Sequence, residues 1–592
     1  MKSIISTIKK TVKNIIYLSS IQFKIGIKGV IYQFSYSILN SSKSFLLILL
    51  PKFLIDACTG FHDANYFLTI LFVFSFVTWI VDIFIGITEV LQSIYNLKFA
   101  HFFKRKIAKK AMSMDYKDME SSKTLDKIER ALDSAYDLSG SQITDFFSYI
   151  LKLAILIYIV STLEWYIAVL TLFVVIIIYL LNKKVSKKNH YYDMLKSPIK
   201  RHKKYVEESM LNFNFSKDLR IFNCQNFLLE KHKKTMNSLI EIQKKQERVN
   251  LFFSVLTNVI NTLFNSAIYV FLIIKYSLGL TAISSFTMYL STVSEFYGAI
   301  DAVFFMFVDF YKTNINIKEV EEFLELKESL HLNEEEDLRI NKIKDIEFRN
   351  VSFTYPGQTV PALNDVSFKI KSNQKVMLVG ENGAGKSTIA KLLMRLYKVD
   401  SGEILLNGIN VDTIPYSSYI SFIEPVFQEV NILAYTLKEN ICFCDRLNDN
   451  DEWLNQVILQ SGLSERIESL PQKINTFYSK SFDEYGVNLS GGEKQKLSIS
   501  RAIYKKGDIL ILDEPNSALD PISEKELFLN INKLGSEKIT IFISHRLSAS
   551  KFCDMIYVFK DGRVVEEGGV GDLIKKKGLF YDMFKKQAEF YN

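Results

Sequence analysis

The stretch Val-Met-Leu-Val-Gly-Glu-Asn-Gly-Ala-Gly-Lys-Ser-Thr, residues 376–388, decides the fold of the C-terminal part of the chain. Its four leading apolar residues predict a buried strand. The run from Gly380 to Thr388 then has the spacing G-x-x-x-x-G-K-[ST] of a phosphate-binding loop, or P-loop. The apolar pattern of residues 389–396 predicts a helix directly after it. Strand, glycine-rich loop and helix follow one another in the order that the motif requires.

This loop is a candidate site for the phosphates of a nucleotide. Its glycines let the backbone curl so that several N–H groups point at phosphate oxygens, and the helix adds its positive dipole end. Lys386 would place a point charge at the β- and γ-phosphates, and Ser387 would offer a hydroxyl to Mg²⁺. The predicted contacts of this loop are Gly380, Glu381, Asn382, Gly383, Ala384, Gly385, Lys386, Ser387 and Thr388.

A second apolar run, residues 509–512, ends in two acidic residues. A buried strand that delivers two acids at its carboxyl end is the Walker B arrangement. Asp513 would hold Mg²⁺ through water, and Glu514 would polarise the attacking water as a general base. The alternative is two surface acids at a strand end, which is uncommon in a chain that also has a P-loop.

The length of 592 residues favours two structural units, since single cores stop growing near about 250–300 residues. From residue 345 onward, short β-rich runs alternate with helical runs, which is typical of an α/β domain. We therefore assign residues 345–592 to an α/β P-loop domain. The charged stretch 316–344 is the predicted linker.

The first half contains six apolar stretches long enough to cross a bilayer as helices. They predict an α-helical polytopic membrane domain over residues 28–315. Residues 1–27 alternate apolar and basic positions at helical spacing, which suits a helix lying in the membrane interface; the alternative is a frayed, charged end. The six predicted spans are 28–56, 65–95, 141–162, 165–182, 251–277 and 283–311.

The distribution of basic residues predicts the orientation. The long breaks 98–130 and 183–204 are rich in Lys and Arg, whereas the short breaks carry almost none. Positive charge stays on the cytosolic side, so we expect a cytoplasmic-membrane protein with its N-terminus and its α/β domain in the cytosol. The formal net charge of +8 sits beside apolar runs. An anionic membrane surface is therefore the expected counterpart, not nucleic acid.

The long cytosolic breaks have apolar residues at helical spacing and few Gly or Pro. We expect them to continue the membrane helices beyond the bilayer as two hairpins. Their tips, near residues 115–120 and 216–223, could press on a soluble domain.

Residues Leu489-Ser490-Gly491-Gly492-Glu493 resemble the signature motif of the ATP-binding cassette (ABC) exporters, which usually ends in Gln rather than Glu. Other residues match elements of that family in order. Tyr355 resembles the aromatic residue that stacks on adenine, Gln428 the Q-loop glutamine, and His545 the switch histidine. Residues 517–520 resemble the D-loop, with Asn516 where the family usually has Thr, and Asp483 and Glu484 resemble the acidic segment before the signature.

The resemblance implies a set of roles and partners. It implies ATP and Mg²⁺, with Glu514, His545 and Gln428 as catalytic residues and with Ser387, Gln428 and Asp513 at the metal. It adds Tyr355, Ser490, Gly491, Gly492, Glu493 and Asp520 to the nucleotide contacts. In the family, the P-loop of one copy faces the signature of another. A homodimer that alternates between inward and outward states is therefore expected, with a heterodimer left open.

The implied function is ATP-driven export of a peptide or an amphipathic small molecule. Multidrug or lipid export is an alternative within the same class, and an ATP-gated regulatory or channel-like protein is an alternative outside it. Residues 217–222 resemble a coupling segment of some bacterial peptide exporters.

Polar residues inside membrane helices are candidates for a substrate cavity because they are costly there. Asn258, Asn261 and Asn265 share one helical face, and Glu295 and Asp309 lie within one arc of the sixth predicted span. Asp82 and Glu89 lie in the second span. The alternative is that these groups bond between helices or lie near helix ends.

Overall fold

The computed structural model describes residues 16–59, 64–138, 141–161, 165–280, 282–326, 342–443, 452–515, 529 and 538–589. The contacts between Cα atoms divide the chain into two units. The first comprises residues 1–109 and 126–326, and the second comprises residues 110–125 and 327–592. The short segment 110–125 therefore groups with the C-terminal unit although it lies among the N-terminal helices in sequence.

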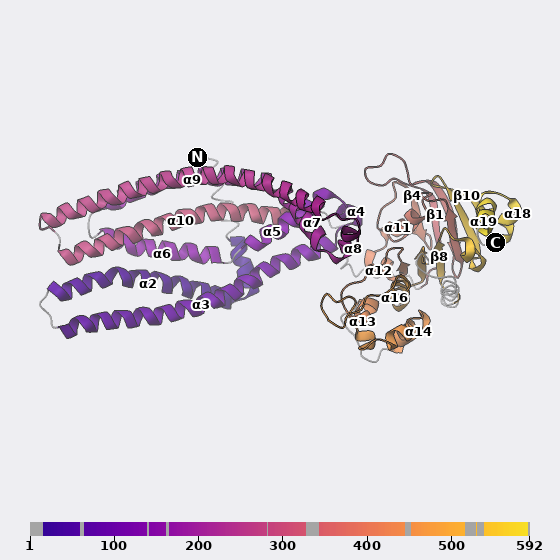
Figure 1. Cartoon of the computed structure of the whole chain (residues 1–592), viewed down its shortest axis with the longest axis horizontal. Helices are drawn as coiled ribbons and strands as arrows, with labels where there is room; N and C mark the ends of the chain where they lie inside the picture. The colour runs from indigo at the N-terminus through magenta and orange to yellow at the C-terminus, as the bar shows by residue number, and fades with distance from the viewer. Residues whose placement is uncertain are drawn as a thin grey trace. The chain divides into compact units, whose positions relative to one another are not determined.

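Long helices build the N-terminal unit (Figure 1). Their apolar faces form a core that includes Ile48, Leu156, Phe264 and Phe296. Within this unit α2, α6 and α10 pack on one another, and α7 packs against α9 and α10. The helices are α2 (Ile27–Thr59), α3 (Ala64–Met112), α5 (Ser122–Asp137), α6 (Ser141–Ser161), α7 (Trp165–Leu211), α8 (Phe213–Ile221), α9 (Gln225–Ser277) and α10 (Ile283–Leu324).

The six predicted spans fall on α2, α3, α6, α7, α9 and α10, which are helical throughout their described parts. Within the described residues, three helices are long and apolar enough to cross a membrane: Ile27–Thr59, Asn65–Met112 and Gln225–Ser277. Ser148–Ile159 of α6 is a shorter apolar helix. The predicted continuation of the membrane helices is confirmed, since α7 and α9 run unbroken for 47 and 53 residues.

The last membrane-domain helix ends later than composition predicts. Residues 316–324, which composition placed in the linker, form the last part of α10, because Ile317, Val320 and Phe323 repeat at helical spacing and are buried. The predicted turn at Gly279 is present, with φ 70°. The predicted turns near residues 60 and 164, the linker stretch 327–341 and residues 1–15 of the interfacial helix lie outside the described residues.

The C-terminal unit contains two β-sheets. The antiparallel sheet has the order β2-β1-β4-β5, and the second sheet has the order β10-β9-β3-β8-β7-β6. In the second sheet all neighbours are parallel except β10 against β9. The strands are β1 (Asp345–Phe353), β2 (Leu363–Lys371), β3 (Lys375–Gly380), β4 (Ser401–Leu406), β5 (Ile409–Asn410), β6 (Ile423–Val426), β7 (Ile509–Asp513), β8 (Ile539–Ile543), β9 (Met555–Lys560) and β10 (Arg563–Gly568).

Helices cover the six-stranded sheet and connect its strands, which makes the α/β domain that the sequence predicted. The longest is α16 (Gly491–Tyr504), the helix that begins after Ser490. The others are α11 (Lys386–Leu393), α12 (Tyr416–Ser421), α13 (Leu437–Cys442), α14 (Glu452–Gln460), α15 (Ser464–Glu468), α18 (Val570–Lys576) and α19 (Leu579–Glu589), with short 3₁₀ turns at Val411–Thr413, Lys473–Asn475 and Leu547–Phe552. The short helix α4 (Tyr116–Met119) belongs to the segment 110–125 that groups with this unit.

Both faces of the parallel sheet are buried, which explains why its strands are continuous apolar runs. In β3, Val376 and Leu378 join the core that faces the antiparallel sheet. Met377 and Val379 join the opposite core, together with Leu497 of α16. The sheet therefore holds the ends of β3, β7 and β8 at fixed positions, and loops after these strands carry the candidate site.

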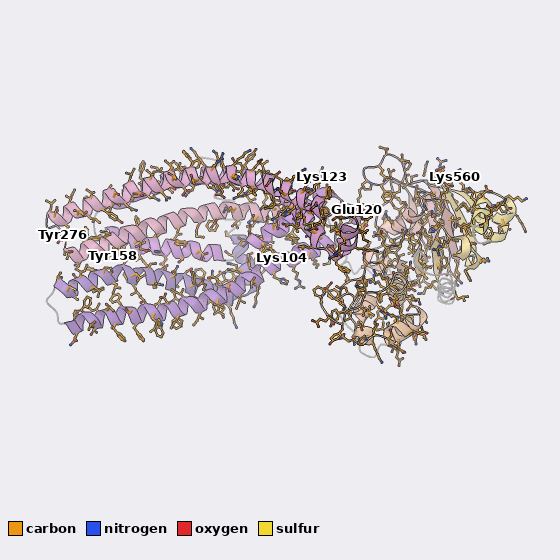
Figure 2. All side chains as sticks on the ribbon, viewed as in Figure 1. Lys104, Glu120, Lys123, Tyr158, Tyr276 and Lys560 are labelled. Atoms are coloured by element: carbon orange, nitrogen blue, oxygen red, sulfur yellow. The ribbon has the colours of Figure 1, made fainter. Side chains whose placement is uncertain are left out.

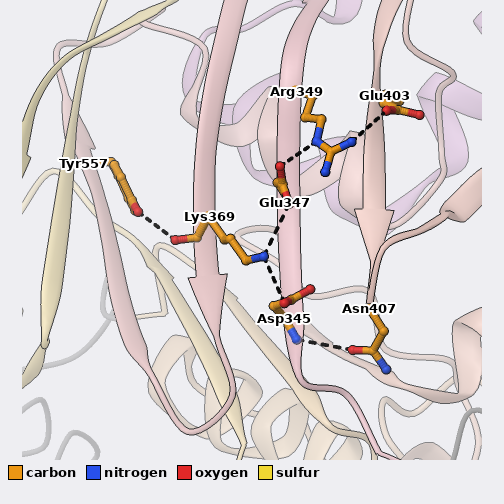
Figure 3. Close-up of polar contacts among 7 residues, drawn as sticks. All are labelled: Asp345, Glu347, Arg349, Lys369, Glu403, Asn407 and Tyr557. Atoms are coloured by element: carbon orange, nitrogen blue, oxygen red, sulfur yellow. Dashed lines mark hydrogen bonds and ion pairs between the residues drawn. The ribbon is translucent and has the colours of Figure 1, made fainter.

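A network of ion pairs lies on the antiparallel sheet (Figure 3). Arg349 of β1 pairs with Glu347 and Glu403, and Lys369 of β2 pairs with Asp345 and Glu347. These side chains are partly exposed, so each pair contributes little to stability. They supply matched control positions for substitutions in the site.

The buried Glu424 on β6 predicts a pH-dependent stability. Its side chain is 1% exposed and lies 2.6 Å from Lys538 Nζ, and burial raises the pKa of its carboxyl to about 7 from an ordinary 4.5. Because the pKa is higher in the folded state than in the unfolded state, the protonated Glu424 carboxyl contributes stability that is fully present below pH 4.5. This contribution is lost as the pH rises to 7.

We therefore expect Glu424→Gln to gain stability relative to the unsubstituted protein between pH 5 and pH 8, by on the order of 3 kcal/mol in total. Unfolding midpoints at several pH values measure this difference. Glu403→Gln, on the exposed network, is the control and should show no such trend. A pH-independent difference for Glu424→Gln would contradict the assignment.

Candidate functional site

The P-loop has the backbone conformation that its glycines allow. Gly380 ends β3 at φ 153°, and Gly385 directly precedes α11 at φ 98°. A Cβ at Gly380 would lie 2.3 Å from the carbonyl oxygen of Phe559, and a Cβ at Gly385 would lie 2.7 Å from that of Ala362. No larger residue fits at either position without a shift of backbone. The loop is thus a preformed cradle that ends at the N-terminus of α11.

Lys386 closes this cradle. Its Nζ donates to the carbonyl oxygens of Gly380 and Glu381 at 2.8 Å each, and the residue is 7% exposed. Burial lowers the pKa of the ammonium, and the carboxylates of Glu514 and Asp513 oppose that shift. The side chain is held over the loop by two carbonyls, where a phosphate could accept from the same donor.

Ser387 and Asp513 form an oxygen pair beside the lysine. The Ser387 hydroxyl donates to Asp513 Oδ1 at 3.3 Å, and Asp513 is the last residue of β7. Burial raises the pKa of Asp513 to about 6, while the Ser387 hydrogen bond opposes the rise. A hydroxyl and a carboxylate are hard oxygen ligands, and Mg²⁺ is usually held by one or two such groups plus phosphate oxygens. The two residues therefore fit a Mg²⁺ ion that accompanies a nucleotide.

Glu514 is held by two side chains from different strand ends. Gln428 Nε2 donates to its Oε2 at 2.8 Å, and His545 Nδ1 lies 3.0 Å from its Oε1. Its backbone has φ 47°, and its N–H donates to the carbonyl of Ile543. Three residues that the sequence spreads over more than a hundred positions thus meet around one carboxylate. The remaining lone pairs of this carboxylate could accept a proton from water.

Tyr355 lies next to the P-loop helix. Its hydroxyl is 3.1 Å from Thr388 Oγ1, and its ring meets Tyr397 edge-on with centroids 5.4 Å apart. Lys391 Nζ lies 5.1 Å from the ring centroid on one face. The ring is partly exposed and supported from its edge, an arrangement that leaves an aromatic surface for a planar base.

Ser490 caps α16 and does not join the P-loop of its own chain. Its Oγ accepts from the N–H of Glu493 at 3.3 Å, and its own N–H donates to Glu493 Oε2 at 2.7 Å. These two bonds form a capping box, with Gly491 and Gly492 in the first turn. Among the described residues, the side chains of Ser490 and Glu493 bond within the start of α16 and to α15. In the described part of one chain, the site therefore contains the P-loop side without the signature.

Comparisons with known proteins identify the chain. A family model described as ABC transporter matches residues 363–517. The subtilin transport ATP-binding protein SpaT of Bacillus subtilis is 30% identical over 537 residues, which cover 88% of this chain and 85% of SpaT. The chain belongs to the ABC exporter family. It is an ATP-hydrolysing transporter that joins a helical membrane domain and one ATP-binding cassette in a single chain.

One further relative and one solved structure are similar to this ABC exporter. The ATP-dependent lipid A-core flippase of Escherichia coli K12 is 37% identical over 243 residues, 41% of each chain. The structure of a bacterial Atm1-family ABC exporter with ATP bound matches with a TM-score of 0.79 at 20% sequence identity. It covers 95% of this chain and 98% of the other, and it supports the fold alone.

The acidic segment before the signature lies within the described residues of this ABC exporter, whereas the D-loop does not. Asp483 and Glu484 lie in a turn in which Asp483 Oδ1 accepts from the N–H of Tyr485 at 2.7 Å. The D-loop, residues 517–520 with Asp520, and the neighbouring Asn516 lie outside the described residues. Their predicted contacts with nucleotide remain predictions.

Sequence reasoning missed how segment 110–125 meets the cassette. Tyr397, after α11, donates its hydroxyl to Glu120 Oε2 at 2.7 Å, and its ring packs edge-on against Tyr116. Burial and this hydrogen bond raise the pKa of Tyr397. The predicted contact of residues 115–120 with a soluble domain is therefore present. Tyr397 could not be found from sequence, because no motif marks it.

The acidic residues of the predicted membrane helices differ in the partners that they contact. Glu295 is 2.6 Å from Lys152, and Asp82 is 2.6 Å from Lys43, so both acids pair between helices. Neither pairing was predicted from the sequence, although an acid inside a bilayer needs such a partner. Asp309 lies 4.0 Å from Lys312 of its own helix. The ion pairs of Glu295 and Asp82 agree with the alternative that these groups bond between helices. A contact of Glu295 or Asp309 with substrate stays a prediction.

The asparagines of α9 remain candidates for contact with a substrate. Asn261 Oδ1 and Asn265 Oδ1 are buried and have no hydrogen-bond partner among the described residues, while Asn258 is exposed. A cavity of about 560 Å³ lies elsewhere in the same unit between α2, α6 and α10 and is almost entirely apolar. Its lining includes Phe45, Leu49, Ile155, Tyr158 and Met288.

Proposed function

We propose that the chain forms a homodimer in the cytoplasmic membrane and exports a peptide or an amphipathic small molecule by alternating access. The observation that carries the ATPase part of this proposal is the Glu514 carboxylate, held by Gln428 and His545 beside Lys386 and Asp513. A gating or signalling protein would not need a general base in working position.

The residues act on ATP in the following way. Tyr355 stacks on the base, and the P-loop N–H groups with Lys386 hold the β- and γ-phosphates. Ser387 and Asp513 would hold Mg²⁺, which would neutralise phosphate charge when bound. Glu514 takes a proton from the water that attacks the γ-phosphorus, and the bond from this phosphorus to the bridging oxygen breaks, which releases ADP and phosphate. Gln428 and His545 orient Glu514.

The second half of the site comes from another copy. Among the described residues, the side chains of Ser490 and Glu493 bond within α16 and to Arg466, and no bond joins them to the P-loop of their own chain. Ser490, Gly491 and Gly492 would therefore be available to the ATP of a partner. One chain carries both a P-loop and a signature. Two identical chains therefore complete two equivalent sites.

The direction of insertion follows from the ends of the helices. Figure 2 shows Tyr158 and Tyr276 near one end of the N-terminal helices and Lys104 toward the other. Aromatic residues favour membrane interfaces, and lysines stay cytosolic. The end that carries Lys104 would therefore be cytosolic. The basic residues of the long breaks 98–130 and 183–204 predict the same side for the N-terminus and the cassette.

Two observations support the proposed substrate class: the apolar and polar groups of the helical unit, and the similarity to a named transporter. The helical unit holds a largely apolar cavity and, elsewhere, two buried amide oxygens without a described partner and two lysine–acid pairs, which together suit a molecule with apolar and polar parts. SpaT, similar over most of both chains, is named for subtilin transport. A lipid or a mixed set of drugs would suit the same cavity less specifically.

Transport into inside-out vesicles tests this function. With ATP and Mg²⁺, such vesicles should accumulate a fluorescent amphipathic peptide, and a non-hydrolysable ATP analogue should not replace ATP. Accumulation that is independent of hydrolysis would favour an ATP-gated channel. ATP hydrolysis that no peptide, lipid or drug stimulates would contradict the export proposal.

The Tyr397–Glu120 bond predicts a coupling variant. Tyr397→Phe keeps the ring against Tyr116 and removes only the hydroxyl that donates a hydrogen bond to Glu120. Since a hydrogen bond to a charged group contributes about 1.5–3 kcal/mol, we expect at least about threefold fewer molecules transported per ATP hydrolysed. Tyr557→Phe, which removes a tyrosine hydrogen bond to the carbonyl of Lys369, is the control. Equal losses in both variants would argue against coupling through this contact.

A further inference from the structure

The signature of this chain ends in a carboxylate, Glu493, where related motifs usually have an amide. Glu493 is the third residue of α16, in the helix turn that the proposed function brings to the phosphate of the partner copy's ATP. A carboxylate and a phosphate are both anions. The first turn of this helix therefore needs a compensating positive charge, which a Gln at position 493 would not require.

The capping box fixes this carboxylate in place. Glu493 Oε2 accepts from the N–H of Ser490 at 2.7 Å, and the Glu493 N–H donates to Ser490 Oγ at 3.3 Å. The carboxylate thus cannot swing away without breaking the cap of α16. Its charge also offsets part of the positive dipole end that would attract phosphate.

Arg466 supplies the compensating charge from a different element. Its Nε lies 2.9 Å from Glu493 Oε1, as an ion pair without the alignment of a hydrogen bond. Arg466 lies in α15, which Leu463 and Ile467 anchor in the core at 2% and 6% exposure. The Arg466 side chain is 35% exposed. It therefore approaches the carboxylate from a fixed helix while remaining open to solvent on one side.

The lysines of α16 are turned to other partners. Lys496 Nζ donates to the carbonyl of Gly462 at 3.2 Å, and Lys494 Nζ lies 5.8 Å from the ring centroid of Tyr478. In the part of the chain that the structure describes, Glu493 forms its ion pair with Arg466 and with neither lysine.

We propose that Arg466 is a positioning residue of the ATPase, which neutralises Glu493 so that a signature ending in Glu can receive the phosphate of the partner's ATP. This inference rests on the proposed function, in which α16 faces that phosphate. Arg466 acts through Glu493: it holds one carboxylate oxygen while the other caps Ser490. The charge at the capped end of α16 is then close to that of a signature with an amide.

A double-mutant cycle tests this proposal on the full-length exporter in lipid. Arg466→Ala should raise the apparent KM for ATP about tenfold, with kcat changed less than twofold, because the uncompensated carboxylate opposes phosphate binding and not the chemical step. The same substitution made in a Glu493→Gln background should raise the KM less than about twofold, since no charge is left to neutralise.

A second readout does not depend on turnover. In a Glu514→Gln background, the ATP concentration that half-protects the exporter from trypsin should rise about tenfold on Arg466→Ala. Arg466→Lys, which keeps a positive charge, should stay within about threefold. Arg349→Ala is the matched control, since Arg349 also pairs with a glutamate but on the antiparallel sheet. It should leave KM unchanged.

The results of these experiments distinguish a positioning role of Arg466 from a structural role and from a failure of the proposed function. An equal KM defect of Arg466→Ala in the unsubstituted and the Glu493→Gln backgrounds would overturn the proposal, as would no defect in either. A lower unfolding midpoint that accounts for the loss, with Arg466→Lys equally affected, would show a structural role and also overturn it. If the unsubstituted exporter neither binds nor hydrolyses ATP, the proposed function itself fails. That result is distinct from a failure confined to Arg466.

Discussion

Replacing Glu514 by Gln lowers ATP hydrolysis by at least about 10²-fold and leaves ATP binding intact. Removing a general base commonly costs about 10²–10⁴-fold, and Gln keeps the size of the side chain and its contact with Gln428. Phosphate release by the purified exporter, together with binding of a fluorescent ATP analogue, measures the two effects separately. The loss should lie in kcat, with the apparent affinity for ATP changed little.

Glu403→Gln is the matched control for this variant. It makes the same change of charge and size on the antiparallel sheet, where Glu403 contacts Arg349. It should keep full activity. If Glu514→Gln retained more than about a third of the wild-type rate, another group would have to take the proton, and our assignment of Glu514 would be wrong.

Replacing Lys386 by Ala weakens ATP binding about 10- to 100-fold. The ammonium now donates to two loop carbonyls and would donate to phosphate oxygens in the complex, and a charged hydrogen bond contributes about 1.5–3 kcal/mol. The variant also leaves the carbonyls of Gly380 and Glu381 without this donor. Displacement of a fluorescent nucleotide analogue at equilibrium measures the affinity.

The control for Lys386→Ala is Lys369→Ala. Lys369 is another lysine of the cassette with two partners, Asp345 and Glu347, but it lies in the exposed network of Figure 3. It should bind ATP normally. Equal binding by Lys386→Ala and the unsubstituted protein would remove the P-loop lysine from the account.

Much of the cassette could be predicted because its chemistry depends on local spacing. The P-loop needs a strand, glycines at fixed offsets and a helix start, and all of these are contiguous in residues 376–388. Asp513 and Glu514 could be predicted for the same reason, since they directly follow a buried apolar strand. The membrane helices were predictable from long apolar runs.

What the sequence could not provide is pairing between distant elements. Nothing in the neighbourhood of Lys152 or Lys43 shows that each faces an acid on another helix, because the register of two packed helices is set by the whole core. The contacts of Arg466 with Glu493 and of Tyr397 with Glu120 likewise join segments whose approach depends on the tertiary fold. The end of the membrane domain was placed too early because charged residues on the solvent face of α10 hid its buried face.

The central claim is that ATP joins the P-loop of one copy to the signature of a second. Cysteines at two exposed positions, Asn382 in the P-loop and Asn488 just before the signature, test it in a Glu514→Gln variant whose five native cysteines are replaced by serine. We predict that oxidation cross-links two chains rapidly with ATP and Mg²⁺ and slowly with ADP. Nucleotide binding without any ATP-dependent cross-link between copies would contradict the account.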